Sequence, residues 1–499
     1  MQTLQKRKQK IIKWTKNPYN ATLLLILILA TAIRLYYFNL VGDQPVWWDE
    51  GEYMSMAKAM AFNIDYNFLP VRPLLLSIIS AFFFKIHPTE FLPRVFMLTL
   101  SLASLIGIYL LGKEMYGKKV GLIAVTLMSA SYLNLFYTFR LLVDLPSLTF
   151  FTFSAYFFYK YFKTNSHKML YFGAITIALG TLFRITTATF LFAMAIYVLL
   201  TQKLKFIKKK EIWIAAIIFI LILTPYIIWG YLQFNGFIIT LAGAHNAPAE
   251  GTMIPNGFSN MLSYIKLFPT TFSLPVLLLL IIGIFLMYNL FLGLDILLFG
   301  KEQKLNKDLF LLLIFLLPII SVSFSLGNNY HEDRYIINSL PAVFIIASSA
   351  IITIYTILKK KSKYLAIALI ILFLALAIYP QLKYADNVIK FKKDSFGEFK
   401  TSGIWLKDNS QPHEEVITSS WPMTGYYSQR NTRGFIKTEE EFEQYKSKHP
   451  NLKYFIISAA QGSPPWSYDY AQRHNLTSIN AYFADQEQQQ PILVIYRLD

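Results

Sequence analysis

The sequence predicts a polytopic α-helical membrane protein with a soluble α/β domain at its C-terminal end. Of its 499 residues, 55% are hydrophobic and only 15% are charged. The mean hydropathy is +0.41, whereas soluble chains are about one quarter charged. Apolar runs of roughly 17 to 26 residues, the length needed to cross a membrane, recur as far as residue 380. Beyond that residue polar side chains become more frequent, and the apolar runs shorten to the length of strands.

The apolar runs give the order of the predicted spans. The first, 20–40, follows a basic N-terminal segment and is not followed by a signal-peptide cleavage site. Between 169 and 201 the chain is long enough for two short spans that meet near Arg184. The other predicted spans are 89–112, 118–137, 146–162, 212–234, 272–297, 309–326, 335–358 and 364–380.

The placement of lysines decides whether the short apolar segment 71–86 also crosses. If it does not cross, every lysine cluster between spans, from Lys113 to Lys363, lies on the side of the basic N-terminus, as the positive-inside rule requires. We therefore predict an interfacial helix at 71–86, about 11 spans, a cytoplasmic N-terminus and an extracytoplasmic C-terminus in the plasma membrane. The outer segments are then 41–88, 138–145, 235–271, 327–334 and the part from 381.

This topology divides the chain into a transmembrane module, 1–380, and an extracytoplasmic α/β domain, 381–499. Thr438 and the three glutamates after it predict the start of a helix, because they suit an N-cap and a first turn. The predicted elements of this domain are strands at 415–419, 452–458 and 491–498 and helices at 395–408 and 438–448.

Charge and cysteine content exclude several classes of function. The net charge of +18 comes from lysine clusters between apolar runs. That pattern is typical of cytoplasmic loops, so we expect no nucleic-acid partner. The chain contains no cysteine, which excludes disulfides, thiolate metal sites and thiol catalysis.

The clearest polar cluster on the predicted outer face is Trp-Trp-Asp-Glu-Gly-Glu-Tyr at 47–53. A helical pattern follows it and places Asp49 at a helix N-terminus, where the dipole keeps a carboxylate ionised and usable as a base or metal ligand. In the alternative interpretation, Asp49 only caps an interfacial helix and the tryptophans belong to the aromatic belt. The spacing alone leaves both open.

This acidic pair is the first of an ordered series of short motifs. The series comprises Asp49-Glu50 with Tyr53, Arg72-Pro73-Leu74, Phe91-Leu92-Pro93-Arg94, Tyr116-Gly117, Phe139-Arg140 to Asp144-Leu145-Pro146, and Arg334-Tyr335. In this order, and on these sides of the membrane, the motifs resemble the GT-C class of polytopic glycosyltransferases. Within that class they are similar to the family of protein O-mannosyltransferases and of the aminoarabinose transferases that modify lipid A.

The resemblance implies that a sugar is transferred, with inversion, from a polyprenyl-phosphate carrier to a protein, lipid or glycan acceptor at the extracytoplasmic membrane surface. Asp49 is then the general base, and Glu50 helps to orient acceptor or donor. Arg72 matches the basic residue before proline that contacts the donor phosphate in this family. Arg334 and Arg184 are expected to add positive charge, although Arg184 fits an interfacial snorkelling residue equally well.

Further residues are candidates for the pocket around this site, namely Tyr53, Arg140, Asp144 and His331. Asp144 either faces Asp49 in a polar pocket that suits a divalent ion, or pairs with Arg140 at i, i+4; we favour the pocket.

A metal ion fits the chemistry but is not required by it. Residues of ligand type occur at His245, Glu250 and 331–333, yet no ligand spacing repeats and the resemblance requires no metal. His245 is therefore better explained as a polar residue of a loop than as a metal ligand. Segment 419–430 resembles the strand and turn found in the terminal domain of such proteins, with a role in acceptor recognition or in support.

A membrane transporter or lipid flippase is the alternative class, because such proteins also have many spans. They bury ionisable groups near the middle of the membrane. In this sequence the centres of the spans are almost free of charge and the acids cluster at the outer ends. This distribution favours an active site at the membrane surface.

Overall fold

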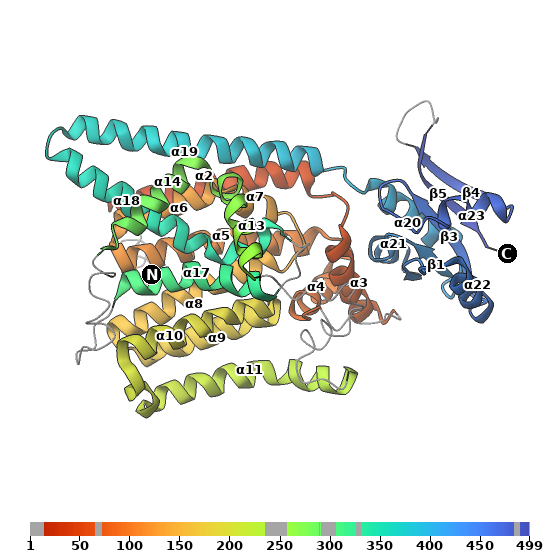
Figure 1. Ribbon diagram of the computed structural model, residues 1–499, viewed down its shortest axis with the longest axis horizontal. Helices are drawn as coiled ribbons and strands as arrows, with labels where there is room; N and C mark the ends of the chain where they lie inside the picture. Colours follow the sequence, from red (N-terminus) through yellow and green to blue (C-terminus); the bar gives the residue numbers. More distant parts are fainter. Residues whose placement is uncertain are drawn as a thin grey trace, which may run out of the picture.

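The computed structural model describes residues 14–64, 72–234, 257–288, 290, 306–325, 331–483 and 490–498. Figure 1 shows an elongated molecule, in which a helical bundle continues at one end into the short helices α3 (Trp48–Phe62) and α4 (Leu75–Ile86). A smaller α/β domain lies beyond this end of the bundle. The molecule therefore has the predicted class of architecture.

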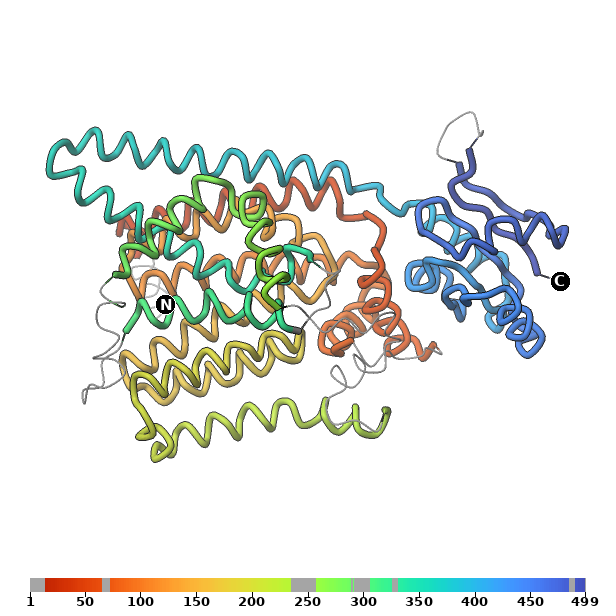
Figure 2. The backbone as a smooth tube through the Cα atoms, viewed as in Figure 1, coloured from red at the N-terminus to blue at the C-terminus, as the bar shows by residue number. Residues whose placement is uncertain are grey.

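Seven helical stretches in the described ranges are long and apolar enough to cross a membrane, or eight if one bent pair counts as a single span. They are Pro18–Val41 (α2), Phe91–Tyr116 (α5), Ile185–Lys208 (η1, α10 and η2), Lys210–Phe234 (α11), Lys307–Phe324 (in α17, Lys307–Ser325), Asp333–Lys359 (η3 and α18) and Lys363–Asn409 (α19 and α20). Other predicted spans form α6 (Lys118–Ala130), α7 (Tyr132–Tyr137), α8 (Asp144–Thr164) and α9 (His167–Phe183). These helices lie among the long ones (Figure 2). Because so many of its helices are long and apolar enough to cross a membrane, the chain is an integral membrane protein.

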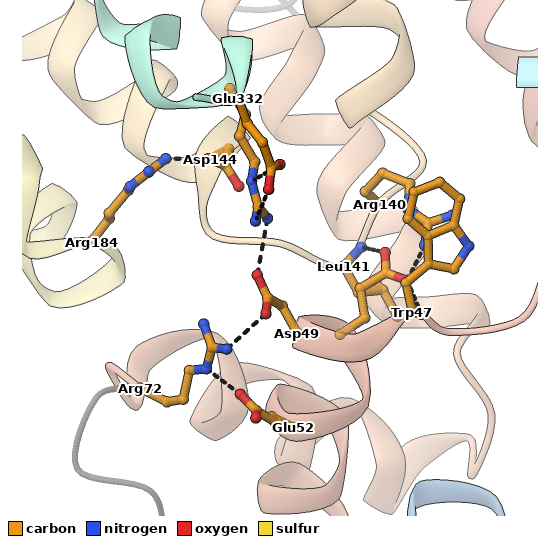
Figure 3. A network of polar contacts seen from close by, with 11 residues as sticks. Trp47, Asp49, Glu52, Arg72, Arg140, Leu141, Asp144, Arg184 and Glu332 are labelled. Atoms are coloured by element: carbon orange, nitrogen blue, oxygen red, sulfur yellow. Dashed lines mark hydrogen bonds and ion pairs between the residues drawn. The ribbon is translucent and has the colours of Figure 1, made fainter. Parts of the chain in front are cut away.

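The predicted break between two short helices near Arg184 is confirmed. Helix α9 ends at Phe183, and Arg184 has extended backbone angles, with φ −153° and ψ 120°. The 3-10 turn η1 (Ile185–Ala188) then leads into α10 (Thr189–Gln202). Arg184 at this break pairs with Asp144 near Asp49 of α3 (Figure 3).

Two segments differ from the sequence-based prediction. Within the predicted outer loop 235–271 the structure has a helix, α13 (Gly257–Phe272), bent by 119° against α14 (Leu274–Phe285). Ser273 between them has a positive φ of 65°, which allows the bend. Helix α19 (Lys363–Lys392) continues past Pro380, where the transmembrane module was predicted to end. Contacts with the bundle hold it, since the Gln381 side chain accepts a hydrogen bond from the Tyr132 N–H at 3.0 Å.

One charged residue of the predicted span 20–40 is an exception to the expectation that the spans are almost free of charge. Arg34 of α2 is fully buried, and its guanidinium donates to the Ser101 hydroxyl at 2.8 Å and to the Asn134 side chain. Neutral hydroxyl and amide groups thus solvate this charge. Arg34 is visible within the predicted span 20–40, but hydropathy does not show which partners its charge meets in the bundle.

The C-terminal domain contains a five-stranded mixed sheet in the order β2-β1-β3-β5-β4. Strand β1 pairs in parallel with β2 and β3, whereas β5 pairs antiparallel with β3 and β4. Alternate residues of β3 enter two apolar clusters, Tyr454 and Ile456 in one and Phe455 in the other. The elements are α20 (Gly397–Asn409), β1 (Glu415–Thr418), α21 (Trp421–Ser428), β2 (Asn431–Arg433), α22 (Glu439–Lys448), β3 (Leu452–Ser458), α23 (Ser467–Arg473), β4 (Ser478–Phe483) and β5 (Pro491–Arg497).

The three strands and two helices predicted for this domain are confirmed. The strand and turn expected within 419–430 are wrong, because α21 occupies Trp421–Ser428. Pro422 stands in its first turn, where a backbone N–H has no acceptor within the helix. A proline, which has no N–H, therefore loses no hydrogen bond there, and its fixed φ favours the start of a helix.

Helix α21 also positions α3. A Cβ added at Gly51 would lie 2.7 Å from the Pro422 carbonyl oxygen, so only glycine permits this close approach. The Val46 N–H donates to the Tyr427 hydroxyl at 2.9 Å. The acidic N-terminus of α3 is therefore held between the bundle and the α/β domain.

Candidate functional site

The predicted helix N-terminus at the acidic cluster is confirmed. Helix α3 begins at Trp48, and Asp49 and Glu50 stand in its first turn. The Trp47 N–H donates to a Glu50 carboxylate oxygen at 2.7 Å, which satisfies one of the free donors at the start of the helix. The helix dipole stabilises negative charge at this position.

Asp49 lies between two arginines from distant parts of the chain, and Figure 3 shows its contact with Arg72. One carboxylate oxygen is 2.7 Å from Nη2 of Arg72, and the other is 3.0 Å from Nη1 of Arg334. The Asp49 side chain keeps 22% of its surface exposed, so it remains accessible. Burial opposes its ionisation, but the positive charges of Arg72 and Arg334 outweigh burial and hold the pKa of Asp49 below its ordinary value.

Arg72 is shared between Asp49 and a second carboxylate, Glu52, to which its Nε donates. Glu52 is 4% exposed, and burial raises its pKa to about 7 although Arg72 acts in the opposite direction. Glu52 was not among the site residues predicted from the sequence. The available signal was its position three residues after Asp49, which places both side chains on one face of a helix.

A second part of the site surrounds Asp144, at the start of α8. Its carboxylate accepts a hydrogen bond from Nη1 of Arg184. Nε of Arg334 is 2.7 Å from a carboxylate oxygen of Glu332, an acid that the sequence suggested only among the residues of metal-ligand type. The ring of Tyr335 lies between the two arginines, with its centroid 5.3 Å from Cζ of Arg184 and 5.2 Å from Cζ of Arg334.

The structure thus brings together most of the predicted charged residues. The assembled group contains four carboxylates, of Asp49, Glu52, Asp144 and Glu332, and three guanidinium groups, of Arg72, Arg184 and Arg334. Every arginine of the group is paired with at least one acid. The pairing of Asp144 with Arg184 excludes the alternative i, i+4 pair with Arg140.

Glu50 and Arg140 form a separate, buried unit. Glu50 is fully buried and accepts hydrogen bonds from the Arg140 guanidinium and from the Leu141 N–H. The Arg140 guanidinium also stacks 3.4 Å from the centroid of the Trp47 ring. Figure 3 shows Arg140, Leu141 and Trp47 of this unit to one side of Asp49. Its position suits a structural link between α3 and the start of α8 better than contact with a substrate.

The remaining predicted pocket residues lie at the edge of the group. Tyr53 is buried, with its ring centroid 5.6 Å from Cζ of Arg72. His331 faces α13, where its Nε2 is 2.8 Å from the Asn260 side-chain oxygen. His245 and Glu250 lie outside the described residues. Within the described ranges, no three His, Cys, Asp or Glu side chains converge as a metal site would require.

The fold and the site define the class to which this chain is similar, the polytopic GT-C glycosyltransferases. Residues 71–229 match the family model described as dolichyl-phosphate-mannose-protein mannosyltransferase. This match and the structural similarities below confirm the resemblance drawn from the sequence motifs. No curated protein gives a significant match.

Solved structures of two enzymes share the fold at low sequence identity. ArnT from Cupriavidus metallidurans, in the apo state, matches with a TM-score of 0.66 and 9% identity, over 94% of this chain and 97% of that chain. The same enzyme bound to undecaprenyl phosphate gives a TM-score of 0.64 at 9% identity over the same shares of both chains. The apo oligosaccharyltransferase of Archaeoglobus fulgidus matches with a TM-score of 0.63 and 13% identity, over 89% of this chain and 70% of that chain.

Proposed function

We propose that the protein transfers a sugar from a polyprenyl-phosphate-linked donor to a hydroxyl or other nucleophile of a lipid, glycan or protein acceptor. The observation that carries this proposal is the position of Asp49. It is an accessible carboxylate at a helix N-terminus, flanked by two guanidinium groups that suit a phosphate. The similar ArnT structure bound to undecaprenyl phosphate supports this class of donor.

The proposed reaction inverts the configuration at the anomeric carbon. Asp49 accepts the proton of the acceptor hydroxyl while the acceptor oxygen forms a bond to the anomeric carbon. The bond between that carbon and the phosphate oxygen breaks, and its electron pair leaves with the polyprenyl phosphate. Arg72 and Arg334 stabilise the negative charge that develops on the leaving oxygen.

The same arginines link donor binding to the strength of the base. Without a donor, both guanidinium groups bind Asp49 and lower its pKa. A donor phosphate that takes up hydrogen bonds from either arginine withdraws positive charge from Asp49, which raises its pKa. Asp49 therefore becomes the stronger base when the donor is in place.

Transfer by this route needs no divalent metal, although the group around Asp49 contains four carboxylates. Arg334 lies between Asp49 and Glu332, and Arg184 binds Asp144. The arginines thus hold the positions in which a cation would neutralise these acids, and they supply the charge that the leaving phosphate requires.

A transfer assay with a panel of polyprenyl-phosphate sugars, run in EDTA, tests the proposal. Asp49→Asn keeps the size of the side chain but removes the base, so turnover should fall by about 10²-fold or more while the donor still binds. Asp394→Asn, an exposed aspartate outside the site, is the matched control. Wild-type turnover in Asp49→Asn would reject the base, and loss of wild-type activity in EDTA would reject transfer without metal.

A further inference from the structure

A cavity lined by charged and apolar residues lies on the other side of α3 from Asp49. Its volume is about 700 Å³, within the range of small-molecule binding sites. Lys58, which lines it, follows Asp49 by nine residues. At about 100° per residue this spacing places Lys58 on the opposite face of the helix. The cavity is therefore separate from the group around Asp49.

The cavity lies at the junction of the bundle with the α/β domain. One wall comes from residues 42–43, directly after α2, and from residues 87–91, directly before and at the start of α5. The other wall comes from α20 and α21, which Figure 1 shows on the side of the α/β domain that faces the bundle. Because α2 and α5 are both candidate spans, their adjacent ends place the cavity at the depth of lipid headgroups.

The charges that line the cavity are mixed. Lys400 is neutralised by Asp43, with Nζ 2.8 Å from a carboxylate oxygen. No ion pair in the described part of the chain involves the other two lysines, Lys58 and Lys407, or the other two acids, Glu90 and Asp408. These two ammonium groups and two carboxylates therefore form no salt bridge with one another, and each can still bind an opposite charge of a ligand.

Lys58 and Glu90 are fixed by the aromatic residue between them. Nζ of Lys58 donates to the Tyr426 carbonyl at 3.2 Å and lies 3.7 Å from the centroid of the Tyr426 ring. The Tyr426 hydroxyl donates to Glu90 at 2.7 Å. Burial lowers the pKa of Lys58 to about 8, a value at which the amine is still mostly charged at neutral pH.

The charge pattern selects the class of ligand. A purely anionic ligand would be attracted by the lysines but repelled by Glu90 and Asp408. A purely cationic ligand would be attracted by these two acids but repelled by the lysines. A zwitterion satisfies both pairs. Phe91, at the rim and half exposed, extends the cavity toward the apolar surface of the spans. We propose that this cavity binds the headgroup of a phosphoethanolamine lipid, with its phosphate at Lys58 and Lys407 and its ammonium at Glu90 and Asp408.

Lipid titrations of the purified, delipidated full-length protein, followed by native mass spectrometry, test this site. Phosphatidylethanolamine should bind at one site and more tightly than phosphatidylglycerol. Lys58→Met keeps the stem of the side chain but loses a charge-assisted hydrogen bond, so phosphatidylethanolamine should bind about tenfold more weakly. Lys446→Met on α22, outside this cavity, is the control and should bind as wild type does.

A second variant keeps the test decisive if Lys58→Met does not fold. Glu90→Gln combined with Asp408→Asn leaves the lysines without acids, so the preference should change to phosphatidylglycerol. Equal binding of both lipids by the wild type, or an unchanged preference in the folded double variant, would overturn the proposal. If soluble O-phosphoethanolamine binds as tightly as the lipid, the proposal that the ligand is a membrane lipid is wrong. These measurements require no turnover, so they are independent of the role of Asp49.

Discussion

At the scale of single residues, Arg72 has two tasks that depend on the shape of its side chain. Its planar guanidinium reaches Asp49 through Nη2 and Glu52 through Nε. Lysine carries the same charge but has a single nitrogen and cannot bridge both acids. Arg72→Lys should therefore reduce sugar transfer by about tenfold, and Arg72→Ala by about 10²-fold.

The competing explanation is that Arg72 only anchors the segment before α4 to lipid headgroups. In that case both substitutions lower the yield of membrane protein, while transfer per folded molecule stays the same. Sugar release from a polyprenyl-phosphate donor, normalised to folded protein, distinguishes the two explanations. An unchanged specific activity in Arg72→Ala removes Arg72 from the site.

Glu52 should dominate the pH dependence near neutrality, since burial raises its pKa to about 7 whereas the pKa of Asp49 is lowered. Ionised Glu52 adds a negative charge beside Arg72 and opposes a donor phosphate, so the KM for the donor should rise as the pH increases through 7. In Glu52→Gln the KM should stay low and constant over this range. A similar rise in both proteins would show that another group titrates.

The same shift has a defined sign for stability. The folded-state pKa of Glu52 lies above its ordinary value of 4.5. Its contribution to folding is therefore complete below about pH 4.5 and is lost as the pH rises through about 7. The melting temperatures of wild type and Glu52→Gln, measured across this pH range, should become equal at its acidic end.

Motifs in the sequence were sufficient to predict Asp49, Arg72, Asp144 and Arg334 as site candidates, but not how they pair. Neighbouring residues in the sequence have different surroundings, because the partly exposed Asp49 pairs with Arg72 and Arg334 whereas Glu50 forms a fully buried pair with Arg140. Successive residues of a helix point about 100° apart, and only tertiary packing decides which direction faces the site. Glu52 was missed although it follows Asp49 by three residues, because this spacing does not show that their shared helix face meets Arg72.

At the scale of elements, the N-terminus of α3 is tied to the start of α8 by the buried Glu50–Arg140 pair. Removing one partner leaves the other charge buried without compensation, which costs about 3–5 kcal/mol in comparable cases. Glu50→Gln should therefore lower the melting temperature of the purified protein clearly, while the folded fraction keeps most of its transfer activity.

An exposed Glu–Arg pair provides the matched control. Glu439 and Arg473 pair at the surface of the α/β domain, and Glu439→Gln should change the melting temperature little. If Glu50→Gln melts with the wild type but loses as much turnover as Asp49→Asn, Glu50 acts in the reaction and the structural role is wrong.

Hydropathy predicted the long helices well, because burial in lipid requires continuous apolar runs. Hydropathy did not predict the bounds of a helix that has mixed polarity or that contacts with other helices stabilise. Helix α13 carries Asn260, buried against the Ser323 carbonyl at 3.0 Å, and was taken for a loop. Helix α19 continues past Pro380 because polar contacts such as Tyr37 with Asp386, at 2.9 Å, support its C-terminal half.

At the scale of the whole molecule, the side of the membrane on which the α/β domain lies also fixes the side of the candidate active site. Helix α21 packs directly against Gly51 of α3, two residues from Asp49. The turn between α10 and α11 lies at the opposite end of the bundle (Figure 1). This turn carries the lysines of Lys203–Lys208, which the positive-inside rule assigns to the cytoplasm.

Two reporter fusions therefore test the proposed topology of about 11 spans with an extracytoplasmic C-terminus. A reporter that is active only outside the cytoplasm should be active when fused after Asp499 and inactive when inserted after Lys208, and a cytoplasmic reporter should give the reverse pattern. Because the two positions lie at opposite ends of the bundle, each serves as the control for expression of the other. A cytoplasmic signal after Asp499 would place the Asp49 group inside the cell, and the lipid-linked donor would then have to be presented by the inner leaflet.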